Sequence, residues 1–362
     1  MRWMKSGLVA AALVVLLSPA AMSAQTIAID PALATIIAGA KREGKLLIRS
    51  TPASTLAGPE AQHAAQQGIE RMFGVDIPIE WSPGAAYGPL AAQLYQEKQA
   101  GIAASTDVLA LTPPQIVPYL DKGLFRTIDW QAAMPSLPPD LVEAGGKALR
   151  VALSLPNILY NPKAAPWVAD IANAGDLLKP EYKGKFVTTP FLGGFDALLA
   201  DDVWGVAKTT AYIKQFAGQI AGFASCGSVD RIASGELAAL ALDCGGGWPN
   251  NLRYRGTGLI ATKIVSDIAE RRYAYITIPT HAAHPNAAIL YALYLDSPEG
   301  QRRVMADYNG FDLGLYPGSY ARKVLDTERA KGVKFTDVTV DWWKTHPHID
   351  REVIDLIKLV QH

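Results

Sequence analysis

AKREGKLLIRST, residues 40–51, is the most informative segment for the fold class of this chain. Its centre is a run of three apolar residues, 46–48, which lies between Gly44 and Arg49. A short strand that is apolar throughout is typical of a parallel sheet that is covered on both faces. The stretch therefore predicts the first strand of an α/β domain, with polar side chains at the carboxyl end of that strand.

Alternating helix and strand patterns continue after this strand, over residues 59–73, 75–81, 89–99 and 107–111. Proline cannot donate to a sheet ladder, so the strand that contains Pro78 is expected at a sheet edge. An edge position for the second strand fits the strand order 2-1-3, with right-handed crossovers between the strands.

The second half of the chain repeats the α/β pattern. Strands are predicted over residues 186–188 and 237–242, and helices over residues 195–206, 209–216, 284–295 and 340–360. Residues 151–160 and 273–278 are extended segments, and we interpret them as strands that cross between two lobes. The predicted fold class is α/β with two lobes, each a mixed sheet flanked by helices. Lobe 1 is expected to comprise residues 25–155 plus 278–315, and lobe 2 residues 156–277 plus 316–362.

The composition is that of a protein with a packed core. Hydrophobic residues make up 49% of the 362 residues and charged residues 19%, which argues against disorder. Without Arg2 and Lys5 the chain has 32 basic against 34 acidic residues. Because there is no basic excess, a nucleic-acid partner is not expected.

The first 24 residues have the layout of a secretory signal peptide. Arg2 and Lys5 give a basic start, and residues 8–17 form an apolar run that small residues follow. A membrane anchor is the alternative, but a run of about ten residues is shorter than the roughly twenty that span a bilayer. Export to the periplasm is therefore expected, with cleavage near Ser23 or Ala24.

The chain has two cysteines, Cys226 and Cys244. An exported protein meets an oxidising compartment, where an even number of cysteines favours a disulfide. Two buried free thiols are an alternative. A zinc pair is disfavoured, because the two residues stand 18 positions apart without CxxC spacing or a neighbouring histidine.

Six segments of the chain follow one another in a recognisable order: AKREGKLLIRST (40–51), DVLALTPPQIVPYLDKGLF (107–125), LYNPK (159–163), DLLKPEYKGKF (176–186), SGELAAL (234–240) and HPNAAILYALYLDSPEGQ (284–301). Together they resemble the extracellular solute-binding proteins of ATP-driven importers, in the branch that includes ferric-ion binders. The resemblance implies a two-lobed periplasmic-binding-protein fold of type II, with the crossing strands as a hinge.

The resemblance also implies a function. A small-molecule solute would bind in the cleft between the lobes and pass to the membrane permease of an ABC importer. No catalysis, cofactor or metal is expected, and the protein is expected to be a monomer. The residue patterns agree independently, since open α/β sheets bind ligands outside the carboxyl ends of their strands and two facing sheets form a cleft that a hinge can close.

Candidate ligand-binding residues in lobe 1 follow the predicted strands: Arg49, Ser50, Thr51, Tyr87 and Thr112. A guanidinium and hydroxyl groups suit an anionic or polar solute, and arginine binds a carboxylate through two parallel hydrogen bonds. Arg49 has the alternative role of a surface ion pair, and Tyr87 that of a packing residue.

Candidate residues in lobe 2 lie in loops after strands or before helices: Thr189, Gly194, Ser228, Asp243 and Trp248. Backbone amides at helix N-termini attract anions. Ser228 has the alternative role of a plain helix cap, and the indole of Trp248 offers a face for stacking. The expected disulfide would pin two of these loops at the edge of the cleft.

The resembled ferric binders use two adjacent tyrosines, and this chain has no Tyr-Tyr pair. Tyr273 and Tyr275 stand two apart, in the segment expected to cross back between the lobes. The expected ligand is therefore a small polar or anionic organic solute, with a ferric ion as the alternative. Two further functions stay open. One is an exported enzyme that uses the same cleft, for which the sequence offers no persuasive acid–base pair, and the second is a subunit that docks on a sensor receptor.

Overall fold

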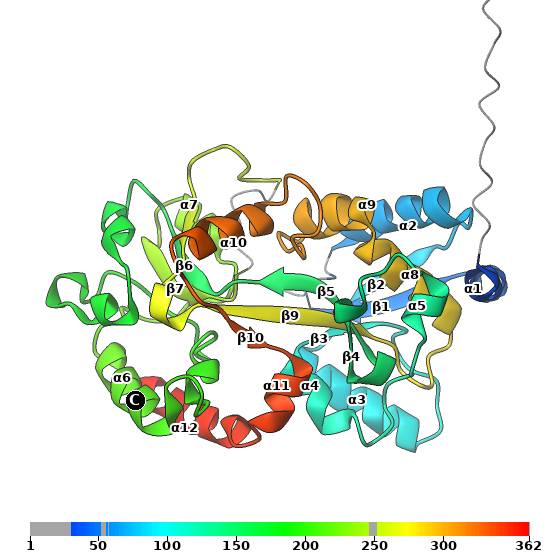
Figure 1. Cartoon of the computed structure of the whole chain (residues 1–362), viewed down its shortest axis with the longest axis horizontal. Helices are drawn as coiled ribbons and strands as arrows, with labels where there is room; N and C mark the ends of the chain where they lie inside the picture. Colours follow the sequence, from blue (N-terminus) through cyan, green and yellow to red (C-terminus); the bar gives the residue numbers. More distant parts are fainter. Residues whose placement is uncertain (1–29, 52–55, 57, 246–251, 362) are drawn as a thin grey trace, which may run out of the picture.

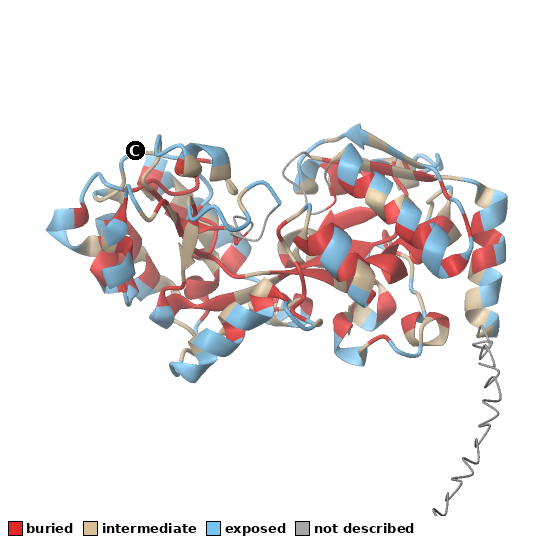
Figure 2. Cartoon of the chain, turned by 90° about the horizontal axis from the view of Figure 1, so that it is seen from above, coloured by how far each residue is buried: buried red, intermediate tan, exposed pale blue. Residues whose placement is uncertain are grey.

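The computed structural model describes residues 30–51, 56, 58–245 and 252–361. The predicted signal peptide lies outside these residues. Figures 1 and 2 show two lobes joined by strands that run between them, with burial concentrated in the middle of each lobe. In the described part of the chain, no helix has both the length and the apolar character needed to cross a membrane.

Lobe 1 is built around the strand order that the sequence predicts. Strand β1 (Leu46–Ser50) pairs in parallel with β2 (Ile79–Pro83), and Ile48 bridges Val108 just before β3 (Leu109–Leu111). The order β2-β1-β3 is therefore confirmed. The second strand begins at Ile79 and not at residue 75, because Pro78 has no N–H for the ladder and contributes only its carbonyl, which accepts from the amide of Leu46.

Helices cover this sheet and connect its strands. They are α1 (Pro31–Glu43), α2 (Pro59–Phe73), α3 (Tyr87–Gln99), α4 (Pro113–Ile116), α5 (Trp130–Ala133), α8 (Pro285–Asp296) and α9 (Pro298–Gly300). Helix α8 is buried along almost its whole length and packs against α1 and α2. The helix predicted over residues 284–295 is therefore confirmed within one residue at each end.

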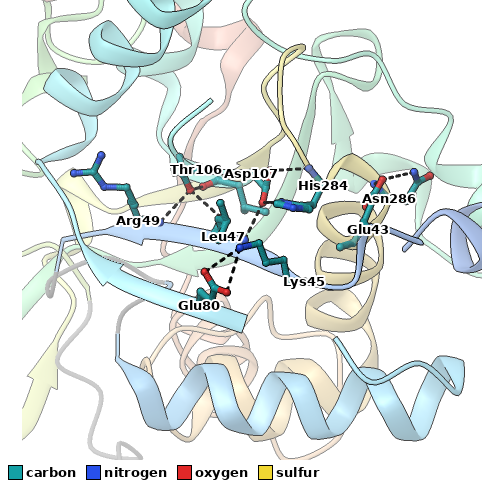
Figure 3. Close-up of polar contacts among 11 residues, drawn as sticks. Glu43, Lys45, Leu47, Arg49, Glu80, Thr106, Asp107, His284 and Asn286 are labelled. Atoms are coloured by element: carbon teal, nitrogen blue, oxygen red, sulfur yellow. Dashed lines mark hydrogen bonds and ion pairs between the residues drawn. The ribbon is translucent and has the colours of Figure 1, made fainter. Parts of the chain in front are cut away.

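The amino end of β1 is anchored by two acidic groups, the buried Asp107 and the half-buried Glu43 (Figure 3). Asp107 accepts hydrogen bonds from the amides of Leu47 at 2.8 Å and His284 at 2.9 Å, and it also contacts His284 Nδ1 at 2.8 Å. Glu43 accepts from the amides of Asn286 and Ala287, which are the unpaired donors of the first turn of α8. These contacts fix one end of β1, so that its other end is held in a defined place.

Two long strands connect the lobes. Strand β5 (Ala148–Ser154) runs antiparallel to β9 (Glu270–Thr277), and β9 also pairs with β3 and with β10 (Thr336–Val338). The predicted return crossing is therefore confirmed. The short strand β4 (Val142–Glu143) extends the sheet beside β5.

The outward crossing differs from the prediction of one strand over residues 151–160. The chain forms β5 and then β6 (Asn157–Tyr160), which belong to different sheets and are separated by Leu155 and Pro156. Strand β5 pairs with β9, whereas β6 pairs with β7 and β8. The change of partners occurs where proline cannot donate to a ladder.

Lobe 2 has a small sheet in the order β7-β6-β8, formed by β6 with β7 (Ala239–Asp243) and β8 (Ala261–Lys263). Lobe 2 also contains the helices α6 (Gly205–Ala217) and α7 (Val229–Ala233). The continuous helix predicted over residues 195–206 is wrong, because the 3₁₀ turn Asp196–Leu199 ends well before α6 begins at Gly205. Gly205 adopts a φ of +76°, which a continuous right-handed helix does not contain.

The C-terminal segment contains α10 (Tyr320–Ala330), α11 (Val340–Thr345) and α12 (Ile349–Gln361). The single helical tail predicted over residues 340–360 is therefore interrupted between α11 and α12. Helix α11 packs against α4 of lobe 1, and α12 packs against α6 of lobe 2. The segment thus spans both lobes, and the boundaries proposed for the lobes stay a prediction.

Candidate functional site

The carboxyl ends of the lobe 1 strands lie on the side where β9 arrives. Strand β3 is antiparallel to β9, with Leu109 opposite Thr277 and Leu111 opposite Tyr275. The end of β3 is therefore directed back along β9 toward lobe 2. Because β1 and β2 run parallel to each other and the bridge from Ile48 to Val108 is also parallel, all three strands end on this side. We call the residues at these ends the lobe 1 rim: Arg49, Ser50, Thr51, Gly84, Tyr87 and Thr112.

Several hydroxyl groups of the lobe 1 rim are used within the fold. Ser50 is buried, and its Oγ accepts a hydrogen bond from Trp81 Nε1 at 2.8 Å. The Oγ1 of Thr112 donates to Gln115 at 2.5 Å at the start of α4. Tyr87 begins α3 and is half-buried against the lobe 1 core, as its packing alternative predicts, while Thr51 is half-buried. Ser50 and Thr112 therefore shape the rim more than they offer free groups to a solute.

Arg49 is the charged side chain of the lobe 1 rim. Its backbone N–H donates to Thr106 Oγ1 at 3.0 Å, which holds the residue in the strand. Figure 3 shows its guanidinium directed away from the anchored end of β1. Among the residues that the structure describes, no carboxylate or other group pairs with this guanidinium. The surface ion pair that was the alternative for Arg49 is not formed there.

The corresponding rim of lobe 2 lies directly against the chain that crosses between the lobes. Strand β7 is antiparallel to β6, with Asp243 opposite Asn157, so β7 ends where β6 begins. A Cβ atom on Gly245 would lie 2.6 Å from the Leu155 amide nitrogen, and one on Gly194 would lie 3.0 Å from Pro156 Cβ. Both glycines also have positive φ angles. Only glycine permits this close approach of the rim to the crossing segment.

The lobe 2 rim comprises the loops at residues 188–194, 225–228 and 243–245. Asp243 is fully buried and accepts hydrogen bonds from the amides of Gly227 at 2.6 Å and Gly245 at 3.0 Å. The predicted disulfide between Cys226 and Cys244 is confirmed, with the Cα atoms 5.4 Å apart. The carboxylate and the disulfide therefore join the same two loops, and Asp243 acts within the fold.

The remaining lobe 2 candidates have mixed outcomes. Thr189 is buried, and its Oγ1 accepts from the amide of Gly193 at 2.9 Å. Ser228 precedes α7, but its Oγ donates to the carbonyl of Ser225 at 2.7 Å and makes no cap bond to the helix. Its alternative role as a side-chain cap is therefore wrong. Trp248 lies outside the described residues.

Phe191, in the first loop of the lobe 2 rim, is not among the residues that the sequence predicts for the site. The side chain is 47% exposed, although phenylalanine is usually buried. Its ring lies beside Gly193, and the sulfur of Cys244 approaches the same glycine. Exposure depends on the folded loop, so the sequence TTPFLGGF carries no signal that would have revealed it.

The tyrosines of the return strand are occupied inside the hinge. Tyr275 is buried and its hydroxyl donates to Glu143 at 2.8 Å, while the Tyr273 hydroxyl donates to Asp337 at 3.1 Å. Burial raises the pKa of Tyr273 to about 12 and that of Tyr275 well above its ordinary value. Neither side chain presents a phenolate to a metal ion. Within the described residues, no cluster of three His, Cys, Asp or Glu side chains is arranged to hold one.

Two concave hollows lie away from the rims. One of about 640 Å³ in lobe 2 is lined by residues that include Lys163, Trp167 and Ala239. Ala239 starts β7, so this hollow is at the opposite end of the strand from Asp243. The other, of about 500 Å³, lies between α2 and β2 on the side of lobe 1. Because open α/β sheets bind ligands outside the carboxyl ends of their strands, the rims are better candidates than either hollow.

Removing the disulfide, with Cys226→Ser and Cys244→Ser combined, is expected to lower the free energy of unfolding by about 2 kcal/mol. Cross-linking a loop of this length stabilises by about 3 kcal/mol in the chain-entropy account. The loss should be smaller, because Asp243 continues to hold both loops through Gly227 and Gly245. Urea unfolding measures the difference, and a reductant should destabilise the wild type but not the double variant. Equal stability of the two proteins would contradict the expectation.

The comparisons with known proteins agree with this geometry. Residues 67–321 match the family described as bacterial extracellular solute-binding protein. No curated protein matches the chain in sequence.

Solved structures share the fold at low sequence identity. The substrate-binding protein of an ABC transporter from Agrobacterium tumefaciens is 14% identical, with a TM-score of 0.67 over 87% of this chain and 94% of that one. The periplasmic binding protein AfuA from Actinobacillus pleuropneumoniae, with fructose 6-phosphate bound, is 15% identical, with a TM-score of 0.65 over 88% and 99%.

Apo ferric ion-binding protein A from Pasteurella haemolytica is 16% identical, with a TM-score of 0.63 over 88% of this chain and 97% of that one. The fold is therefore the two-lobed fold of type II periplasmic binding proteins. Together with the match over residues 67–321, this shows that the chain belongs to the bacterial extracellular solute-binding proteins, the class that captures solutes for ABC importers.

Proposed function

We propose that this protein captures a small polar or anionic organic solute between its two rims and releases it unchanged. The observation that carries the proposal is that both rims border the crossing strands. The lobe 1 rim lies beside β9 where this strand enters lobe 1 and pairs with β3. The lobe 2 rim packs on Leu155 and Pro156. A change of angle at these strands would bring the two rims together over a solute.

The proposal extends to the place and partner of the protein. The chain is exported to the periplasm, its signal peptide is removed near Ser23 or Ala24, and the closed monomer delivers the solute to the membrane permease of an ABC importer. It has no catalytic role. The family match supports this setting, and the signal-like composition of residues 1–24 supports export.

A ferric ion remains the alternative ligand, because structural neighbours include ferric binders. We favour an organic solute because the chemistry of the rims is poor in metal ligands. Asp243 is engaged by two amides, and Tyr273 and Tyr275 are engaged in the hinge. A hard cation such as iron requires several oxygen ligands that converge on one point.

Small-angle scattering and thermal unfolding across a panel of solutes test the proposal. A solute that binds should reduce the radius of gyration by closing the lobes, and at 100 times its Kd it should add about 2.7 kcal/mol of stability. Native mass spectrometry of the purified protein, to identify any retained solute, guides the choice of panel. Scattering that stays unchanged for the solute that the protein retains, or turnover of that solute, would overturn the proposal.

A further inference from the structure

The two rims differ in chemical character. On the lobe 1 rim, Arg49 supplies a cation that no described residue neutralises. On the lobe 2 rim, the one carboxylate among the described residues, Asp243, is buried and bound to two amides. The charge that the described rims offer to a ligand is therefore positive and comes from lobe 1. A closed site of this kind would leave a buried cation unless the ligand brings an anion.

The lobe 2 rim presents an exposed apolar group beside its disulfide. The ring of Phe191 is 47% exposed and lies beside Gly193, next to the sulfur of Cys244. The hydroxyl of Thr189 in the same loop is occupied by the amide of Gly193. The loop therefore offers a ring face and a disulfide, and closing the lobes over them would remove apolar surface from water.

We infer that the solute is an organic carboxylate with an apolar or aromatic body, whose carboxylate binds Arg49 of lobe 1 and whose body packs on Phe191 of lobe 2. The inference rests on the proposed function and names the ligand class for the same site. A planar guanidinium matches a carboxylate through two parallel hydrogen bonds, and aromatic rings pack well on a phenylalanine face. A ligand of this class contacts both lobes at once, so it stabilises the closed form over the open form.

Arg49→Gln and Phe191→Ala separate the two contacts. Binding is measured by calorimetric titration with phenylacetate, benzoate and hexanoate as apolar carboxylates. Two compounds serve as controls: acetate has the carboxylate without an apolar body, and benzyl alcohol has an aromatic body without the negative charge. We expect the apolar carboxylates to bind, with affinity reduced about 10- to 100-fold by Arg49→Gln and about tenfold by Phe191→Ala. Acetate and benzyl alcohol should bind at least tenfold more weakly than phenylacetate.

Matched controls show that the effects belong to the rims. Lys45→Gln removes a cation that pairs with Glu80 at the amino end of β1. Ile102→Ala removes an apolar side chain that is 55% exposed and lies in the segment between α3 and β3, away from the rims. Both should leave the affinity for phenylacetate unchanged. Thermal unfolding of each variant without ligand confirms that the fold is intact.

The possible outcomes distinguish this inference from the proposed function. If no apolar carboxylate binds, or if Arg49→Gln and Phe191→Ala bind as the wild type does, the inference is overturned. If fructose 6-phosphate or ferric citrate closes the lobes instead, the inference is overturned but the proposed function stands. If a retained solute binds without compaction in solution scattering, the proposed function itself is overturned.

Discussion

Replacing Glu143 with alanine is expected to lower the free energy of unfolding by about 3–5 kcal/mol. The carboxylate is buried at the hinge and accepts hydrogen bonds from Arg150 Nε at 2.5 Å, the Tyr275 hydroxyl at 2.8 Å and the Val340 amide at 2.8 Å. Removing it leaves the guanidinium of Arg150, only 15% exposed, without its carboxylate. An uncompensated buried charge is among the costliest results of a single substitution.

The position of Glu143 explains why removing one carboxylate should cost so much stability. It stands in β4 and joins β5 through Arg150, β9 through Tyr275, and the start of α11 through Val340. Three crossing or spanning elements therefore meet at one group. Arg150 also stacks over the ring of Tyr273 at 4.2 Å, so it cannot easily move to water when its partner is lost.

Urea unfolding of Glu143→Ala against Glu80→Ala provides the comparison. Glu80 pairs with Lys45, but the two side chains are 59% and 41% exposed, so its loss should cost less than about 1 kcal/mol. A similar loss of unfolding free energy in both variants would contradict this expectation. It would show that Arg150 reaches solvent or another partner in the folded protein.

The start of the fold could be predicted because its signals are local. The apolar strand at residues 46–48 and the proline before β2 together specify the order β2-β1-β3 within about 65 residues. The pairing of Cys226 with Cys244 was equally accessible, because only two cysteines exist. The same logic puts candidate residues at strand ends, and Arg49 and Thr189 lie on the rims. Their contact with a ligand stays a prediction.

The role of each polar side chain could not be predicted, because its partner is distant in the sequence. Ser50 is bound by Trp81, 31 residues away, and Asp243 by Gly227, 16 residues away. Nothing in the local pattern distinguishes a hydroxyl that contacts a solute from one that closes a loop. The split of the outward crossing at Pro156 has the same origin, since it depends on which strands lie beside β5 and β6.

The wild type is expected to lose stability when the pH rises from about 4.5 to about 8, and replacing Glu270 with glutamine should make this loss smaller by about 3 kcal/mol. Glu270 begins the crossing strand β9 and is only 3% exposed. Burial raises the pKa of its carboxyl group from 4.5 to about 7, and the nearby charge of Asp196 adds to this effect, while Arg272 opposes it.

The geometry around Glu270 explains why Arg272 does not keep it ionised. The guanidinium donates from Nε to Glu270 at 2.7 Å, but it also pairs with Asp196 from lobe 2. One cation therefore serves two carboxylates in a buried place. The second oxygen of Glu270 has no hydrogen-bond partner among the described residues, so the charged form is poorly solvated there.

The sign of the pH effect follows from the two pKa values. Between about pH 4.5 and about pH 7, the folded protein keeps a proton on Glu270 that the unfolded chain releases. Stability therefore falls as the pH rises through this window, and the penalty is complete above the folded-state pKa. Glutamine binds no proton in either state, so Glu270→Gln should be less sensitive to this rise in pH.

Urea unfolding of the wild type and Glu270→Gln at several pH values measures the difference. Asp296, Asp312 and Asp350 also have raised pKa values through burial, but they are present in both proteins and cancel in the comparison. Glu80→Gln controls for the loss of a surface carboxylate. Parallel profiles for wild type and Glu270→Gln would mean that Glu270 titrates alike in the folded and unfolded chain. Arg272 would then neutralise Glu270 fully despite its second bond to Asp196. Burying the ionised Glu270 at the hinge would then cost no stability at neutral pH.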